Sequence, residues 1–169
     1  MDVLVAYASK HGSTARIARA IAVRLTEVGV PAAARPVDDV DGLDDVPAVV
    51  LGSAIYAGSW RKEAVEFVHR HAEPLAERPV WLFSSGPLGE QVQDEEEQPR
   101  QLPEIVGIVR PVEHRIFFGA LDRSKLGFGE RMIVKAVKAP DGDFRDWDEI
   151  RAWADAIASD LAARDGDPH

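Results

Sequence analysis

Residues 3–29 read VLVAYASKHGSTARIARAIAVRLTEVG, and this stretch decides the fold. It opens with a nearly continuous apolar run at 3–8, which is typical of a strand buried on both faces. Small and polar residues follow, and from 13 to 28 apolar side chains recur at helical spacing. The stretch therefore predicts a strand, a loop and a helix, with the loop at the carboxyl end of a central parallel strand.

The rest of the chain repeats this alternation. Further strands are predicted at 32–37, 47–54, 79–86 and 113–121, an acidic loop at 38–45, and helices at 61–77, 101–109, 125–138 and 147–163. Strands that alternate with helices imply a parallel sheet covered on both faces and joined by right-handed crossovers. We expect one α/β domain over residues 1–163, followed by a polar tail at 164–169.

Composition narrows the classes of function. A chain of 169 residues, 46% of them hydrophobic, suits one buried core rather than two typical domains. No apolar run is long enough to span a bilayer and the N-terminus lacks signal-peptide features, so we expect a cytoplasmic protein. The net charge of -9 argues against nucleic-acid binding. Because cysteine is absent, any redox chemistry must come from a cofactor.

Three loops are predicted at the carboxyl ends of the strands, where open α/β sheets bind ligands. They are SKHGST at 9–14, GSAIYAGSW at 52–60 and SSGPLG at 84–89. The first places hydroxyl groups and a glycine at the start of a helix, where free N–H groups and the helix dipole favour an anion. It matches neither G-x-x-x-x-G-K-[ST] nor G-x-G-x-x-G, and it suits one phosphomonoester better than a triphosphate. Helix capping by Ser13 and Thr14 is the alternative interpretation.

The second and third loops are suited to a flat aromatic cofactor. Tyr56 and Trp60 offer aromatic walls, and Gly58 allows a peptide to reorient because glycine accepts φ values that other residues avoid. For Tyr56 and Trp60 the alternative is packing at the start of the following helix. Residues 85–88 of the third loop are expected to form the opposite wall.

The first loop resembles the phosphate loop of flavodoxins, in which a hydroxyl residue, a polar or aromatic residue, a glycine and a threonine stand at these spacings. The resemblance covers residues 1–162 and is strongest to the branch of menaquinone-dependent protoporphyrinogen dehydrogenases, through SKHGST, GSAIYAGSW, FFGALD at 117–122 and DFRDW at 143–147. It implies a flavodoxin-like three-layer α/β sandwich, whose five parallel strands run in the order 2-1-3-4-5, and FMN as the cofactor. With the loop walls above, the candidate cofactor-binding residues are Ser9, Lys10, His11, Gly12, Ser13, Thr14, Ala54, Ile55, Tyr56, Ala57, Gly58, Ser85, Gly86, Pro87, Leu88 and Gly89.

The resemblance also implies a flavin that passes electrons from a reduced substrate, such as a porphyrinogen, to a quinone. The acidic stretch QDEEEQ at 93–98 would repel the carboxylates of a porphyrinogen, so the substrate stays open. A non-catalytic electron-transfer protein that docks on a redox partner protein, and a flavin-free interaction module, are the alternatives. No catalytic residue and no metal site is predicted.

A basic amphipathic helix is expected at 125–138, with an apolar arc beside a basic one. Two interpretations of it stay open. Its apolar arc packs on the sheet, or the helix makes a peripheral contact with a membrane surface.

Overall fold

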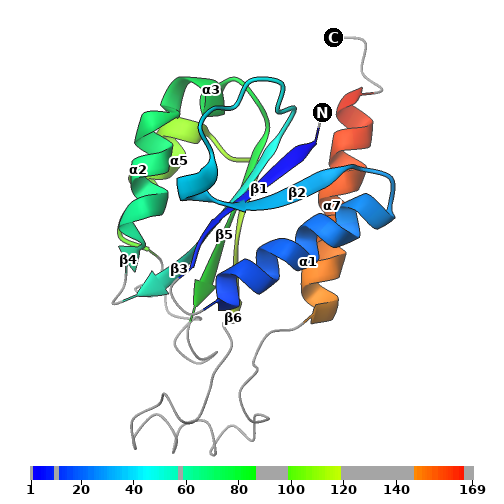
Figure 1. Ribbon diagram of the computed structural model, residues 1–169, viewed down its shortest axis with the longest axis horizontal. Helices are drawn as coiled ribbons and strands as arrows, with labels where there is room; N and C mark the ends of the chain where they lie inside the picture. Colours follow the sequence, from blue (N-terminus) through cyan, green and yellow to red (C-terminus); the bar gives the residue numbers. More distant parts are fainter. Residues whose placement is uncertain (1, 10–11, 57–58, 87–98, 119–146, 166–169) are drawn as a thin grey trace, which may run out of the picture.

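A parallel sheet with helices on both faces forms the centre of the computed structural model (Figure 1), which describes residues 2–9, 12–56, 59–86, 99–118 and 147–165. The strands are β1 (Val3–Ala8), β2 (Ala32–Pro36), β3 (Val49–Tyr56), β4 (Ser59–Trp60), β5 (Val80–Gly86) and β6 (Glu113–Phe118). The hydrogen-bonded order is β2-β1-β3-β5-β6, and the two-residue β4 pairs antiparallel with β3. Without β4, this is the predicted order 2-1-3-4-5, so the flavodoxin-like fold is confirmed.

The helices divide between the two faces of the sheet (Figure 1). They are α1 (Ser13–Glu27), α2 (Lys62–Arg70), α3 (Ala72–Ala76), α5 (Leu102–Val109) and α7 (Trp147–Asp165), with a short 3-10 helix, η1, at Val37–Asp39. Side chains alternate along β1, so that Val3 and Val5 pack under α1 and α7, whereas Leu4 and Ala6 pack under α2, α3 and α5. Both faces are buried, which explains why the strand reads as a continuous apolar run.

The predicted helix at 61–77 is two helices that meet at His71, whose φ of -114° and ψ of 28° are not helical. The cause lies in the sequence, because Pro74 has no N–H to donate to the carbonyl of Arg70 and its ring would clash with that carbonyl. His71 is 6% exposed and its ring packs on Phe67 at a centroid distance of 4.8 Å.

Several other boundaries differ from the prediction, among them that of the third strand, which is β3 at Val49–Tyr56 instead of 47–54. Residues 59–60 form a strand rather than a loop, residue 37 begins η1 instead of ending β2, and α7 continues to Asp165. In the last turn of α7, Arg164 Nε donates to Asp160 Oδ2 at 3.2 Å. The predicted helix at 125–138 and the end of the predicted strand at 113–121 lie outside the described residues.

The outer edge of β2 offers few free main-chain groups. Val3 N–H donates to Pro31 C=O at 2.9 Å, so by the alternation of a parallel ladder Ala32, Ala34 and Pro36 direct their main-chain groups away from β1. The Ala32 N–H donates to Thr26 Oγ1 at 3.3 Å, and Pro36 has no N–H. Among the three, Ala34 is the residue that has an outward-facing N–H for which neither a side-chain acceptor nor a proline removes the free donor.

A close approach between neighbouring strands shapes the face covered by α1 and α7. A Cβ on Gly52 of β3 would lie 2.0 Å from Cζ of Phe83 on β5. The Phe83 ring therefore occupies the space that a side chain at 52 would need. It also packs against Phe117 and Trp153, at centroid distances of 6.2 and 6.1 Å.

We predict that Gly52→Ala lowers the free energy of unfolding by about 1–3 kcal/mol or more, because the buried Phe83 ring must move out of its cluster. Gly107→Ala is the matched control, since nothing lies within 4 Å of a Cβ there and the residue is inside α5. That change should stabilise the protein by up to about 1 kcal/mol. Denaturant unfolding of both variants checks this, and wild-type stability of Gly52→Ala would show the prediction to be wrong.

Candidate functional site

The three predicted loops begin at one edge of the sheet, because β1, β3 and β5 are parallel neighbours whose carboxyl ends lie side by side (Figure 1). The register pairs Ala8 with Ser53 and Ala54 with Ser85, which places the second loop between the other two. The predicted residues that the structure describes at these strand ends are Ser9, Gly12, Ser13, Thr14, Ala54, Ile55, Tyr56, Ser85 and Gly86. The others, Lys10, His11, Ala57, Gly58, Pro87, Leu88 and Gly89, lie outside the described residues, and their roles stay predictions.

The start of α1 has the geometry of an anion site. Gly12 is its N-cap, with φ 85° and ψ -8° in the left-handed region, and no side chain caps the helix there. The first helical hydrogen bond runs from Arg16 N–H to Gly12 C=O at 3.1 Å, so the N–H groups of residues 13–15 precede it. The first turn carries no acidic residue. These donors and the positive end of the helix dipole favour a negatively charged ligand.

Two hydroxyl groups of this loop can donate to a bound ligand. Thr14 is fully buried, and its Oγ1 has no hydrogen-bond partner in the described part of the chain. Ser9 Oγ accepts from Gly12 N–H at 3.0 Å, which leaves its own proton to donate. A buried hydroxyl without a partner costs about 1–3 kcal/mol, so a ligand oxygen at Thr14 would remove a real penalty. The residues present fit a phosphomonoester, and Thr14 is not a capping residue.

A hollow of about 430 Å³ adjoins this loop. Its walls come from the end of β1, from η1 and from the start of α2, and they are Tyr7, Ala8, Ser9, Pro36, Val37, Asp38, Arg61 and Glu63. Arg61 Nε donates to Glu63 Oε2 at 2.7 Å, so the cation in this wall is already paired.

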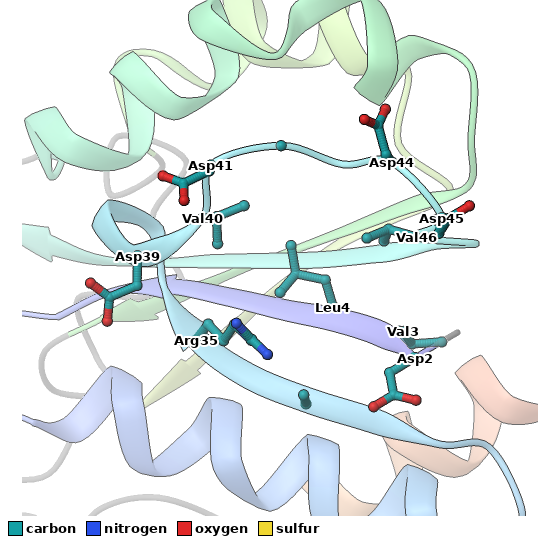
Figure 2. Close-up of a pocket in the computed structure, with 12 residues that line it drawn as sticks. Asp2, Val3, Leu4, Arg35, Asp39, Val40, Asp41, Asp44, Asp45 and Val46 are labelled. Carbon is teal, nitrogen blue, oxygen red and sulfur yellow. The ribbon is translucent and has the colours of Figure 1, made fainter.

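A second hollow, of about 520 Å³, lies at the opposite end of β1 (Figure 2). Figure 2 shows aspartates around its rim, with Arg35 among them. Asp2, Asp39, Asp41, Asp44 and Asp45 all line it. These carboxylates would repel a phosphate, so we do not assign the anion site to this hollow despite its larger volume.

The loop beside the acidic hollow is fixed by Arg78. Its guanidinium donates from Nη1 to the carbonyl oxygens of Leu43 and Val46, both at 2.6 Å, and from Nε to Pro74 C=O at 2.7 Å. One cation thus joins the acidic loop to the end of α3. The contact gives the loop a structural anchor and supplies no ligand to the hollow.

A buried chain of polar side chains lies behind the second and third loops. Trp60 Nε1 donates to Ser84 Oγ at 2.7 Å, and Ser84 Oγ lies 2.7 Å from His114 Nε2. An indole N–H only donates, so Ser84 Oγ accepts from Trp60, and its own proton can go to His114 Nε2 when the neutral imidazole carries its proton on Nδ1. Burial lowers the pKa of His114 to about 4, which agrees with a neutral imidazole.

The position of Trp60 decides between its two interpretations. Its side chain is 3% exposed and packs in the cluster under α2, so it forms no wall of a ligand site. The alternative, packing at the start of the following helix, is the one that fits. Tyr56 pairs with Ser59 across the β3–β4 hairpin, and the two residues 57 and 58 separate this pair.

The family model described as "Flavodoxin domain" matches residues 4–148 of this chain, which is well over half of its length. The chain belongs to the flavodoxin domain family. The predicted resemblance is therefore confirmed for the family and for the fold.

The relatives of this flavodoxin domain include both an enzyme and a small flavodoxin. A protoporphyrinogen IX dehydrogenase [quinone] of Escherichia coli K12 is 23% identical over 172 aligned positions, which cover 94% of this chain and 95% of that enzyme. Oxidised flavodoxin 2 from Bacillus cereus aligns with a TM-score of 0.63 at 23% identity, covering 95% of this chain and 99% of that one.

Rubredoxin oxygen:oxidoreductase of Desulfovibrio gigas aligns with this flavodoxin domain at a TM-score of 0.62 and 15% identity, covering 96% of this chain. The aligned part is 36% of that protein, so this chain spans about a third of its length. In the part of this chain that the structure describes, no helix combines the length and the apolar character that crossing a membrane requires.

Sequence reasoning on this flavodoxin domain missed Ser84 and His114. Ser84 was predicted at the end of the strand at 79–86 and the start of the third loop, but its full burial in β5 and its hydrogen bonds were not predicted. The available signal was a histidine within the strand EHRIFF at a position that alternates with Glu113 and Arg115. That alternation places His114 on the sheet face under α2, but it does not say which residue pairs with it.

We predict that the unfolding free energy of the apoprotein falls as the pH is lowered from 6.5 towards 4, in part through His114. Its folded pKa of about 4 lies below the ordinary value of 6.5, so between these pH values the unfolded chain binds the extra proton. The loss approaches about 3 kcal/mol and stops below pH 4. Denaturant unfolding at pH 7 and 4.5 measures it.

His114→Gln is the control for this pH dependence, since its amide oxygen accepts from Ser84 but does not titrate. The fall in its unfolding free energy over the same interval should be smaller than that of the wild type by about 2–3 kcal/mol. Other groups with lowered pKa, such as Glu113 and Asp155, remain in both proteins and cancel in the comparison. Equal pH dependence of the two proteins would contradict the assignment to His114.

Proposed function

We propose that this flavodoxin domain binds FMN at the carboxyl ends of β1, β3 and β5 and works as an oxidoreductase. The observation that carries the proposal is Thr14 Oγ1, a buried hydroxyl without a partner among the described residues, at the uncapped start of α1. A phosphomonoester supplies the acceptor that Thr14 lacks and the negative charge that the helix start favours. FMN is a cofactor whose phosphate is of this kind.

The protein's own groups then have distinct tasks. The N–H groups of residues 13–15 and the hydroxyls of Ser9 and Thr14 hold the phosphate, together with the predicted residues Lys10 and His11. The hairpin between Tyr56 and Ser59 and the segment that begins at Ser85 enclose the ring, with the predicted residues 57–58 and 86–89. When bound, the flavin supplies the electron transfer that this chain, which has no cysteine, does not supply itself.

For the electron acceptor we propose a quinone. The match to a protoporphyrinogen IX dehydrogenase [quinone] extends over 94% of this chain, so the similarity is not limited to the phosphate loop. A porphyrinogen is the corresponding candidate donor, although the acidic residues at 93–98 disfavour a substrate with several carboxylates. We place this reaction in the cytoplasm, with a membrane contact through residues 125–138 as a route to the quinone.

A non-catalytic electron-transfer protein is the second candidate, and the charge of the molecule favours it. The chain carries 29 acidic against 20 basic residues, which suits docking onto a basic redox partner protein. Anaerobic mixing of the reduced, FMN-loaded protein with menadione separates the two candidates. Rapid oxidation of the bound flavin without a partner protein supports the quinone oxidoreductase, whereas oxidation that requires a partner protein supports the carrier.

We predict that Thr14→Val weakens FMN binding about tenfold or more, because it removes a hydrogen-bond donor to the phosphate and keeps the shape of the side chain. The same change should leave the apoprotein at least as stable as wild type, since it replaces an unpaired buried hydroxyl by a methyl group. Fluorescence titration of the apoprotein with FMN and denaturant unfolding measure the two effects.

Two controls accompany this titration. Thr14→Ser retains the hydroxyl and should bind FMN close to the wild-type level. Thr26→Val is the same chemical change near the other end of α1, where Thr26 donates to Ala22 C=O at 2.9 Å. It should lower stability without changing FMN affinity. Unchanged affinity of Thr14→Val would remove the assigned role of Thr14, and a wild-type protein that ignores FMN would leave the flavin-free interaction module.

A further inference from the structure

The β3–β4 hairpin, which carries the second loop of the proposed flavin site, has little strand pairing of its own. β4 is two residues long, and it pairs with β3 through Ile55 with Trp60 and Tyr56 with Ser59. So short a hairpin is marginal by itself in water. Its orientation must therefore depend on contacts from other elements.

Three side chains hold the base of this hairpin, two from outside it and one from the earlier part of β3. Ser84 Oγ of β5 accepts from the Trp60 indole at 2.7 Å, and Gln101 Oε1 accepts from the Trp60 main-chain N–H at 3.1 Å. Ser53 Oγ of β3 accepts from the Arg61 main-chain N–H at 2.9 Å. Trp60 is thus bonded through both its side chain and its backbone.

The two serines stand next to each other in the sheet. Ser53 and Ser84 are paired in the β3–β5 register, and both are fully buried. Paired residues of parallel neighbours point to the same face, so both hydroxyls lie under α2, below the edge where the loops begin. They are polar residues in an otherwise apolar layer, and every such buried hydroxyl needs a partner.

We propose that Ser84 and His114 are positioning residues of the flavin site, which hold the Trp60 indole and through it the orientation of the hairpin at Tyr56–Ser59. The inference rests on the proposed function, because the hairpin matters here as one wall of the flavin site. Ser84 must accept from the indole, and this requires its own proton to go elsewhere. We assign to His114 the tautomer with its proton on Nδ1, so that Nε2, 2.7 Å from Ser84 Oγ, accepts that proton.

The neutral state of His114 makes this arrangement specific. An unprotonated Nε2 orients the Ser84 hydroxyl so that its lone pair faces Trp60, whereas a leucine at 114 would leave the hydroxyl free to turn. Removal of Ser84 leaves a buried indole N–H without an acceptor. In both cases the hairpin is released, while the phosphate loop between β1 and α1 keeps its own contacts.

The test compares four variants in the FMN-loaded protein. Ser84→Ala and Trp60→Phe break the bond to the indole, His114→Leu removes the acceptor, and His114→Gln restores an acceptor. Trp60→Phe keeps an aromatic ring in the core, so it remains informative if Ser84→Ala does not fold. The readouts are the FMN dissociation constant, the visible flavin spectrum and the midpoint potential of the bound flavin.

We expect Ser84→Ala, Trp60→Phe and His114→Leu to weaken FMN binding about tenfold and to shift both the spectrum and the potential, with His114→Gln close to wild type. Glu113→Leu is the matched control. It breaks another indole bond, from Trp153 Nε1 to Glu113 Oε1 at 2.6 Å, on the opposite face of the sheet. It should lower the unfolding free energy and leave the spectrum and potential unchanged.

The inference fails in either of two cases, and only in the second does the proposed function fail with it. If the first three variants lose stability as Glu113→Leu does but keep the wild-type spectrum and potential, the polar chain is structural and the proposed function stands. If the wild-type protein binds no FMN, the proposed function fails and this inference fails with it. Failure of His114→Gln to restore the wild-type potential would show that the acceptor is not what His114 contributes.

Discussion

Much of the core depends on the missing side chain of Gly52. Because the backbone of β3 is bare at this position, the Phe83 ring lies across it, and Phe117 and Trp153 complete an aromatic cluster. Trp153 belongs to α7, so this cluster is where the last helix meets the sheet. Trp153 also donates to Glu113 on β6, which joins the last helix to the last strand by a directed bond as well as by packing.

On β3 and β5 the next pair of residues points to the opposite face of the sheet. That pair is polar, whereas Gly52 and Phe83 are apolar. Ser53 follows Gly52 and Ser84 follows Phe83, and these serines hold the hairpin at Trp60 and Arg61. The pairing of β3 with β5 therefore acts on both faces of the sheet. On the face towards α7 it brings Gly52 and Phe83 together in the core, and on the face towards α2 it brings together the two serines that hold the base of the second loop. The proposed flavin site therefore lies directly beyond the paired residues Gly52–Phe83 and Ser53–Ser84.

The sequence predicted well what depends on local pattern. The apolar run at 3–8 and the helical spacing at 13–28 identified β1 and α1, and the alternation of strands and helices indicated a parallel sheet, whose strand order came from the resemblance to flavodoxins. Thr14 was singled out for its place in the loop, and its burial without a partner could not be read from neighbouring residues. The burial of Trp60 was equally hidden, because its acceptor Ser84 stands 24 positions away in the chain.

The free edge of the sheet at β2 has a consequence for how this protein behaves in crowded solution. An alanine-rich edge strand would ordinarily invite another chain to add to the sheet and start aggregation. Here Thr26 Oγ1 accepts from the N–H of Ala32 and Pro36 has no N–H, so Ala34 is the residue of β2 that still offers an outward N–H to an incoming strand. Repulsion between copies, each with a net charge of -9, acts in the same direction. A helix threonine and a strand proline thereby reduce the main-chain N–H groups through which another chain could extend the sheet at β2.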